Sequence, residues 1–416
     1  MSVRRALQWL VVCALAAAAG AVGFAQEQQA LCDGGEGQFE AALHDGAGVT
    51  VGPVTNRHGF AGRTCSASLT WKDATVLGVA TAGQIDLDAM GADLSFGVPV
   101  AAFEIRQAAN DWRATYAIYS LDKVPRLLAK LTGGDFYQAV DADFDGRIAI
   151  WTTDAAAVNG FDGLRYADYD FPPTVVLRYE HRRLEDVSSE YPTQYDEQIA
   201  QVRAQLTPQA LAAFQVSDGK LEDGFRPWPE LIPLRKTKAK VLEIVWSYLY
   251  SGREAEAWGE LARMWPRADL ERVKAAMVAA RAKGFDASVA SVAGPVDHRH
   301  HWRVAVYDSK GINRDIPQRA GNAALTHLPY QETDLSEGVV DVSPQPITMM
   351  RDEMVRETEM VMLVIDAAGK VRSAKMAGGE ADPQLLEDAK AWKFIPAFKD
   401  GHAVACRMKM IITPQL

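Results

Sequence analysis

The C-terminal end of this 416-residue chain holds the pattern that most restricts its fold. Glu359–Asp366 is a run of Met, Val, Leu and Ile between two acids, and such residues are enriched in β-strands. Ala367–Lys370 follows as a tight turn in which Gly369 can supply a positive φ, and Val371–Met376 returns as a second strand. The pattern predicts a β-hairpin.

A helix and a final strand follow this hairpin. Asp382 stands before Pro383, where the side chain that caps a helix N-terminus is expected. Apolar residues then share one helical face, namely Leu385, Leu386 and Ala389. Ala403–Thr413 alternates as a strand, with one side formed by Met408, Met410 and Ile412. The predicted order is strand, strand, helix, strand.

This order resembles the C-terminal domain of the TonB family, over residues 338–416. Besides the hairpin and the capped helix, the features that match are Trp392–Ala397 and the closing Asp400–Val404 segment. The resemblance implies a β-β-α-β domain that meets a periplasmic or outer-membrane protein by pairing an edge strand with a short segment of it. It implies a binding module and not an enzyme.

The chain departs from TonB energy transducers between its two ends. Those proteins bridge the periplasm with a long, semi-rigid Pro-rich segment, whereas the 19 prolines here are scattered. We therefore expect a partner-binding adaptor with folded domains upstream, linked to envelope transport.

The N-terminus has the features of an export signal. Arg4–Arg5 is a positive start, Trp9–Ala25 has no charge, and Gly23–Ala25 fits a small-x-small cleavage site. We expect residues 1–25 to be a signal peptide that is removed from a periplasmic protein. The alternative is that residues 6–25 remain as an inner-membrane anchor, and only then would the chain contact a membrane.

Charge excludes one class of partner. The formal net charge is −10, and removal of the signal peptide takes two arginines and no acid, which gives −12. Nucleic acids and anionic membranes are bound by basic faces, so we expect no nucleic-acid partner.

Cysteine use agrees with export. Without its signal peptide the chain has three cysteines, Cys32, Cys65 and Cys406. A disulfide between Cys32 and Cys65 is the preferred pairing in an oxidising periplasm, and it would attach the N-terminal segment to the first strands. Cys406 would then be left over in the core of the C-terminal domain.

Residues 26–183 form a β-rich domain in our interpretation. Short apolar runs separated by Gly and Asp recur between Thr64 and Ser120, as in a meander of strands. A helix is predicted over Lys123–Leu131. Strands are predicted again at Ile148–Thr152 and Thr174–Tyr179.

Residues 184–290 have helical periodicity. Two helices are predicted over Glu197–Phe214, where Pro208 starts the second, and a linker over the prolines of 227–233. Thr237–Tyr250 places its apolar residues on one helical face, and two further helices follow it. The segment looks weakly like a tetratricopeptide-type helical hairpin, with too few repeats for an array.

Residues 291–337 are predicted to be a strand followed by a polar linker. The predicted fold class is therefore α+β and multidomain. It has a β-rich N-terminal domain, a small α-helical domain and a C-terminal TonB-like β-β-α-β domain.

An aspartate-rich loop is the strongest chemical motif. Asp141, Asp143 and Asp145 alternate, and Gly146 permits the sharp turn that brings three carboxylates onto one Ca²⁺. The flanks are strand-like, so the loop looks more like the calcium loops of β-propeller blades than a helix-flanked loop. The alternative is an acidic turn that binds no metal.

Two ligand positions of such loops are not acidic here. Position nine is Ala149 and position twelve is Thr152, so Asp154 is the acid that would have to contribute instead. Calcium is the one cofactor that the chain suggests, and none is required by the motifs. His298 and His300 could share a strand face, but no third zinc ligand is evident nearby.

Two functions remain in view. The first is a periplasmic interaction protein, because the chain has no metalloprotease, serine-hydrolase or phosphate-loop motif and is not expected to be an enzyme. The second is an extracytoplasmic calcium-stabilised receptor or hydrolase built on the β-rich domain, because the aspartate loop is followed by the aromatic-rich segment Phe161–Phe171.

Overall fold

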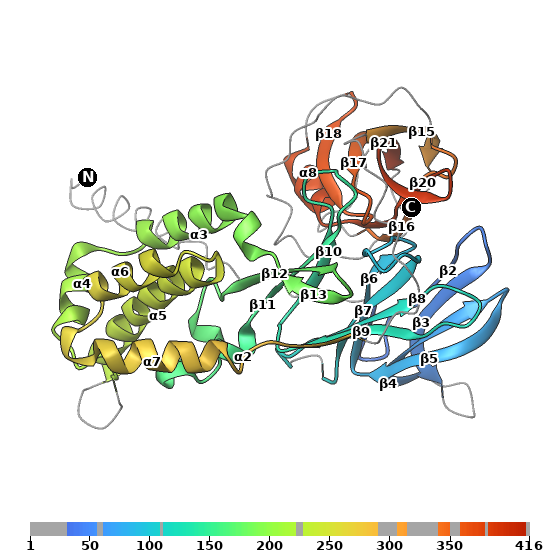
Figure 1. The fold of residues 1–416 in the computed structure, drawn as a ribbon. Helices are drawn as coiled ribbons and strands as arrows, with labels where there is room; N and C mark the ends of the chain where they lie inside the picture. The colour runs from blue at the N-terminus through green and yellow to red at the C-terminus, as the bar shows by residue number, and fades with distance from the viewer. Residues whose placement is uncertain are drawn as a thin grey trace, which may run out of the picture.

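The computed structural model describes residues 31–55, 61–108, 111–221, 228–289, 306–313, 340–349, 358–378 and 382–412. This is a mixed α/β protein, rich in mostly antiparallel strands. Figure 1 shows three regions: a helical region, a β-rich body beside it, and a C-terminal module that sits on the body. The expected signal peptide 1–25, its anchor alternative 6–25 and the histidines of 298–301 lie outside the described residues.

The body begins with an antiparallel four-stranded sheet. In spatial order its strands are β2 (Phe39–Ala42), β3 (Ala47–Thr55), β4 (Ala61–Trp71) and β5 (Ala74–Ala82). A disulfide joins Cys32 to Cys65 of β4, the pairing preferred from the sequence. It ties the first described residues to this sheet.

A six-stranded antiparallel sheet forms the centre of the body. In spatial order its strands are β1 (Cys32–Asp33), β6 (Gln84–Met90), β7 (Val100–Arg106), β8 (Thr115–Ser120), β9 (Leu127–Thr132) and β14 (Asp286–Val289). The helix predicted over Lys123–Leu131 is wrong. Leu128 and Leu131 are buried because the segment pairs between β8 and β14, so ladder hydrogen bonds and cross-strand packing outweigh its helix-like spacing.

A second four-stranded antiparallel sheet completes the body. Its strands are β10 (Tyr137–Val140), β11 (Ala149–Thr153), β12 (Thr174–Glu180) and β13 (Arg183–Asp186). The short helix α2 (Ala155–Val158) and two 3₁₀ turns (Phe161–Gly163 and Tyr166–Asp168) connect β11 to β12. The predicted strands at 148–152 and 174–179 correspond to β11 and β12.

The helical region follows β13 after a 3₁₀ turn (Ser188–Glu190). Its helices are α3 (Pro192–Ala204), α4 (Pro208–Gln215), α5 (Trp228–Tyr250), α6 (Glu254–Met264) and α7 (Leu270–Arg281), the last preceded by a 3₁₀ turn (Arg267–Asp269). The linker predicted over 227–233 is wrong, because α5 starts at Trp228 and contains Pro233. Pro233 is the sixth residue of α5, so its missing amide removes one intrahelical hydrogen bond, while the remaining turns of this long helix continue after it.

The C-terminal module contains the predicted order of strand, strand, helix, strand as β17 (Glu359–Ile365), β18 (Val371–Met376), α8 (Pro383–Lys390) and β21 (His402–Ile412). Asp382 caps α8 by accepting the amides of Gln384 and Leu385. The module has further strands that are not predicted from the sequence: β16 (Gln345–Thr348), β19 (Lys393–Ile395) and β20 (Ala397–Lys399). It also includes β15 (Val306–Asn313), which lies within the 291–337 segment predicted to be a strand followed by a linker. β15 runs parallel to β21, and β20 pairs antiparallel with it.

The cores show how the regions are joined. One continuous apolar core runs from the central sheet into the helical region and includes Tyr116, Phe161, Trp246 and Trp265. The module has a separate apolar core between β17, β21 and α8, and this core includes Trp392. No helix within the described ranges has the length and apolar character needed to cross a membrane.

Candidate functional site

The aspartate loop connects β10 to β11 and gathers three carboxylates. One oxygen each of Asp141, Asp143 and Asp145 lies within 4.8 Å of the others. Gly146 has the positive φ of 79° that the motif predicts, and its amide donates to Oδ2 of Asp141 at 3.2 Å. Asp145 Oδ1 accepts the amide of Arg147 at 2.7 Å. The loop therefore brings together three of the four expected calcium ligands.

Asp154, the fourth expected ligand, lies elsewhere. It follows β11, whose antiparallel register with β10 pairs Val140 with Ala149 at one end and Tyr137 with Thr152 at the other. Asp141 and Asp154 are thus at opposite ends of the hairpin. Asp154 instead caps α2 through the amide of Ala157 and accepts the hydroxyl of Tyr250 at 2.6 Å. Its assignment as a metal ligand is incorrect.

Asp141 carries an oxygen that fits a cation. The residue is only 1% exposed, and its Oδ1 atom has no hydrogen-bond partner among the described residues. Burial, followed by the charges of Asp366, Asp145 and Asp143, raises the pKa of Asp141 well above its usual value. Leaving a buried carboxylate oxygen unpaired is costly, and carboxylates are preferred ligands of Ca²⁺. Asp143 is exposed, which leaves the group open to solvent on one side.

The same loop contacts the C-terminal module. Arg372 of β18 donates to the carbonyls of Asp141 at 2.6 Å and of Ala142 at 3.1 Å. Asp366, in the turn after β17, accepts the amide of Asp141 at 3.1 Å. Phe144 packs against Val364 and Ala405 of the module. The loop is therefore an inter-region contact as well as an acidic cluster.

Two lysines of the module extend this contact across the central sheet. Lys370 donates to Oδ1 of Asp88 at 2.6 Å and to the Asp88 carbonyl, and Lys393 donates to Oδ2 of Asp86. We call Asp86, Asp88, Asp141, Asp366, Lys370, Arg372 and Lys393 the docking network. All seven side chains are buried. Burial opposes the charge of Lys393, but the carboxylates of Asp86 and Asp88 outweigh it and raise the pKa of Lys393.

The sheet beneath the docking network is polar where a sheet centre is usually apolar. Glu104 lies opposite Asp86 on one side and Tyr116 on the other in the strand register. Asp88 Oδ2 accepts the Tyr116 hydroxyl at 2.6 Å, and Glu104 Oε2 accepts the amide of Tyr137 at 2.8 Å. Burial, partly offset by Arg106, raises the pKa of Glu104 to about 7. These buried groups are hydrogen-bonded, as buried polar groups generally are.

Of the docking network, only Asp141 is predicted as a site residue from the sequence. Gln84–Met90 alternates polar and apolar residues, which indicates a strand with one face toward solvent. Every residue of this strand is nevertheless buried, because the module covers its polar face. The available signal was the pair of matching alternations. Asp86 and Asp88 alternate on one strand, while Lys370 and Arg372 alternate at the start of another. Opposite charges at matching spacing are a hint of pairing that a single sequence cannot assign.

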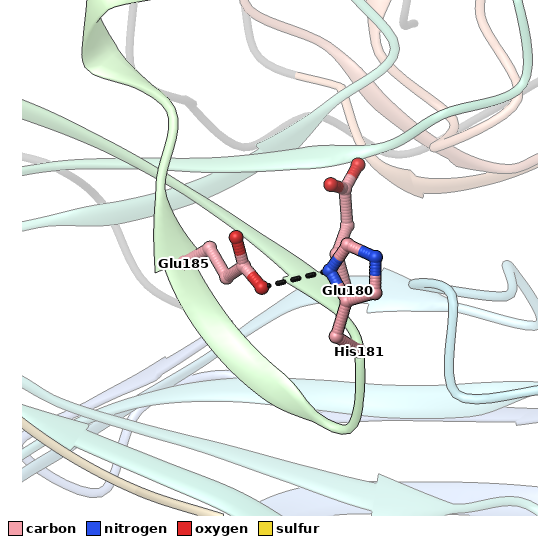
Figure 2. A group of neighbouring side chains, drawn as sticks. All are labelled: Glu180, His181 and Glu185. Carbon is pink, nitrogen blue, oxygen red and sulfur yellow. Dashed lines mark hydrogen bonds and ion pairs between the residues drawn. The ribbon is translucent and has the colours of Figure 1, made fainter.

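A second acidic group lies at the tip of the β12–β13 hairpin. Figure 2 shows Glu180, His181 and Glu185 there, with Nδ1 of His181 2.9 Å from Oε1 of Glu185. Glu180 is already engaged by two arginines, Arg147 and Arg178. His181 is exposed, so this group has the features of a charged turn and lacks the buried, unpartnered oxygen of the aspartate loop.

The aromatic segment that followed the aspartate loop in sequence serves the helical region. Phe161 stacks edge-on against Trp246 with ring centroids 5.5 Å apart. Asp162 pairs with Lys238 at 2.7 Å and with Arg272 at 2.6 Å. Because these contacts account for the segment by packing and ion pairing, it adds no group to the aspartate loop.

The C-terminal module has an edge strand. β18 pairs with β17 and has no second ladder partner in the part of the chain that the structure describes. The amide of Ala377 donates to the carbonyl of Met360 at 2.8 Å across the hairpin. Groups that face the partner strand alternate along an antiparallel ladder, so the backbone groups of Ala374 and Met376 face away from β17.

Comparison of the chain with protein-family models, with curated proteins and with solved structures finds no match in any of the three.

Proposed function

We propose that this protein is an exported adaptor of the cell envelope whose C-terminal module binds an extended segment of a partner protein. The observation that supports this function is the edge of β18, where Ala374 and Met376 present backbone groups away from the sheet. Such an edge is a template for an added strand. The TonB-like pattern of the C-terminal residues points to the same use.

The module is also suited to present this edge to a partner. Arg372, at the start of β18, is clamped by the aspartate loop, and Lys370 just before it is clamped by Asp88. Further along the strand, Lys375 is exposed. Because one end of β18 is already fixed while the other end is accessible, less conformational entropy is lost when a partner segment pairs with this strand. The proposal is for a binding protein in the periplasm and includes no catalytic step.

The test is site-specific cross-linking in the native envelope. A photoreactive residue at position 375, beside the proposed strand, should give adducts with a partner protein that mass spectrometry identifies. Ala374→Pro removes the outward amide and should abolish the adducts, because proline cannot donate to an added strand. Ala374→Val keeps that amide and is the matched control, in which adducts should persist.

A photoreactive residue at Val216, which is 85% exposed on the far helical region, should give no such adducts. Deletion of residues 338–416 should abolish capture of the same partner. Adducts of equal yield in Ala374→Pro, with the fold intact by circular dichroism, would show that the edge of β18 is not the binding surface.

A further inference from the structure

We propose that a divalent cation, Ca²⁺, binds the aspartate loop and thereby locks the C-terminal module onto the β-rich body. This inference goes beyond partner binding, because it concerns how the two regions of one chain are held together. It starts from Asp141, whose buried Oδ1 atom lacks a hydrogen-bond partner among the described residues, and from Asp143 and Asp145, which each place an oxygen within 4.8 Å of a carboxylate oxygen of Asp141. A cation satisfies that oxygen and neutralises the group.

The residue that offers this oxygen is fixed by the module. The backbone amide of Asp141 donates to Asp366, and its carbonyl accepts from Arg372. These hydrogen bonds hold the two peptide units that flank the Cα of Asp141, and so they fix the direction in which its side chain leaves the backbone. The module therefore helps to hold the first ligand in place, and loss of the module would release it.

The middle of the loop is fixed in the same way. Phe144, between two of the acids, has a positive φ of 59°, which is costly for a non-glycine residue. Its side chain packs on Val364 and Ala405, and the guanidinium of Arg372 lies 5.5 Å from its ring centroid. The conformation that gathers the carboxylates is thus the one that inserts Phe144 into the module.

Repulsion among the acidic side chains at this contact favours coupling between cation binding and docking of the module. The three loop carboxylates lie together, and Asp366 accepts the amide of Asp141, while the guanidinium of Arg372 lies 3.8 Å from Asp366. Like charges in a buried contact repel, so the docked arrangement is disfavoured until a cation offsets them. Oxygen-only ligands and an open side for water suit Ca²⁺ better than Mg²⁺, which demands near-ideal octahedral geometry.

Binding and docking must then strengthen one another by the same factor. The experiment uses the whole exported chain, residues 26–416, with CaCl₂ as the probe. Calorimetry should show one Ca²⁺ bound with an affinity in the range of extracellular sites, a dissociation constant of about 0.1–1 mM. Calcium should also slow hydrogen exchange in β17 and β18 about tenfold relative to chelator, with MgCl₂ at equal concentration having a smaller effect.

Variants separate binding from coupling. Asp143→Asn with Asp145→Asn should abolish both calcium binding and the slowed exchange. Phe144→Ala and Arg372→Met leave the three acids in place, and each should weaken calcium binding about tenfold if the module holds the loop. Glu185→Gln, in the other acidic group, is the matched control and should change neither readout.

No calcium binding up to about 10 mM would overturn the cation site, since extracellular calcium modules bind below that concentration. Unchanged affinity in Phe144→Ala, checked for folding by circular dichroism, would overturn the coupling even where calcium binds. Should Arg372→Met fail to fold, Phe144→Ala alone decides.

Discussion

The helical region and the C-terminal module both pack on the β-rich body, but by different chemistry. The helical region shares one apolar core with the body, in which Trp246 of α5 meets Phe161 of the body and is fully buried. The module keeps a core of its own and meets the body through the seven charged side chains of the docking network. Apolar contacts add to this, chiefly Ile347, Ile395 and Phe398.

The two kinds of contact attach the regions in different ways. Burial of apolar area is non-directional and favourable, so a shared core makes the helical region and body one folding unit. Buried ion pairs add little net stability over apolar contacts but depend on geometry and partner. The module is therefore attached in one orientation by contacts that solution conditions can change.

The largest expected effect comes from the shared core. Trp246→Ala should lower the free energy of unfolding by about 4 kcal/mol, because the side chain is fully buried and a cavity remains. If the helical region and body form one unit, hydrogen exchange should accelerate in α5 and in the central sheet together. Trp258→Ala, at a partly exposed position of α6, is the control with a smaller loss. Acceleration confined to the helices would show that the helical region and the body do not unfold as one unit.

Breaking the docking network should have a more local effect. Lys370→Met leaves the buried carboxylate of Asp88 without its cation, which costs about 3 kcal/mol. The loss should be measured as faster exchange in β17 and β18, with α5 unchanged. The double variant Lys370→Met with Asp88→Asn should recover part of it, since the amide oxygen still accepts from Tyr116 without a buried charge. Equal acceleration in α5 would contradict separate attachment.

A turn within the module gives a third test. Gly369 has φ of 84°, and a Cβ there would lie 1.8 Å from the carbonyl oxygen of Phe394. Gly369→Ala should therefore cost about 2 kcal/mol from the unfavourable φ and the displaced β19 strand. Gly378→Ala has open space and serves as the control. Thermal unfolding should show the loss in the module, and an unchanged transition would mean that β19 does not hold the hairpin.

The sequence predicted local structure well where one pattern dominated. β17, β18, α8 and β21 follow from alternation, a glycine turn and a capping aspartate, all set by neighbours in the chain. The predicted helix over Lys123–Leu131 failed because β9 takes its structure from β8 and β14, which are partners that local propensity ignores.

In the candidate site, too, the residues placed by local sequence could be predicted and those placed by distant partners could not. Asp141, Asp143 and Asp145 could be grouped because the spacing that gathers them is local. Asp154 was misassigned because its place depends on the β10–β11 register, and Lys370 was missed because Asp88 lies 282 positions away in the chain. The matching alternation of acids and of basic residues in two distant strands does not tell which residues pair, because one sequence carries no information on long-range partners.

A pH dependence of stability should appear on both sides of the body. Burial raises the pKa of both Glu104 and Glu243 to about 7, one beneath the docking network and one on α5. Between their unfolded value and pH 7 the folded protein binds more protons than the unfolded chain, so stability falls as pH rises through this window and levels off above it. Each group contributes at most about 1.4 kcal/mol per pH unit.

Glutamine at either position removes that titration and should flatten the slope, measured as free energy of unfolding from pH 5 to pH 8. Glu104→Gln should flatten it for exchange in the central sheet and the module, because Glu104 borders Asp86 and Lys393. Glu243→Gln should flatten it around α5, where its carboxylate accepts the amides of Asp170 and Phe171. If Glu243→Gln changed the module as strongly as Glu104→Gln does, charge in the helical region would reach the docking network, and the two attachments would not be independent.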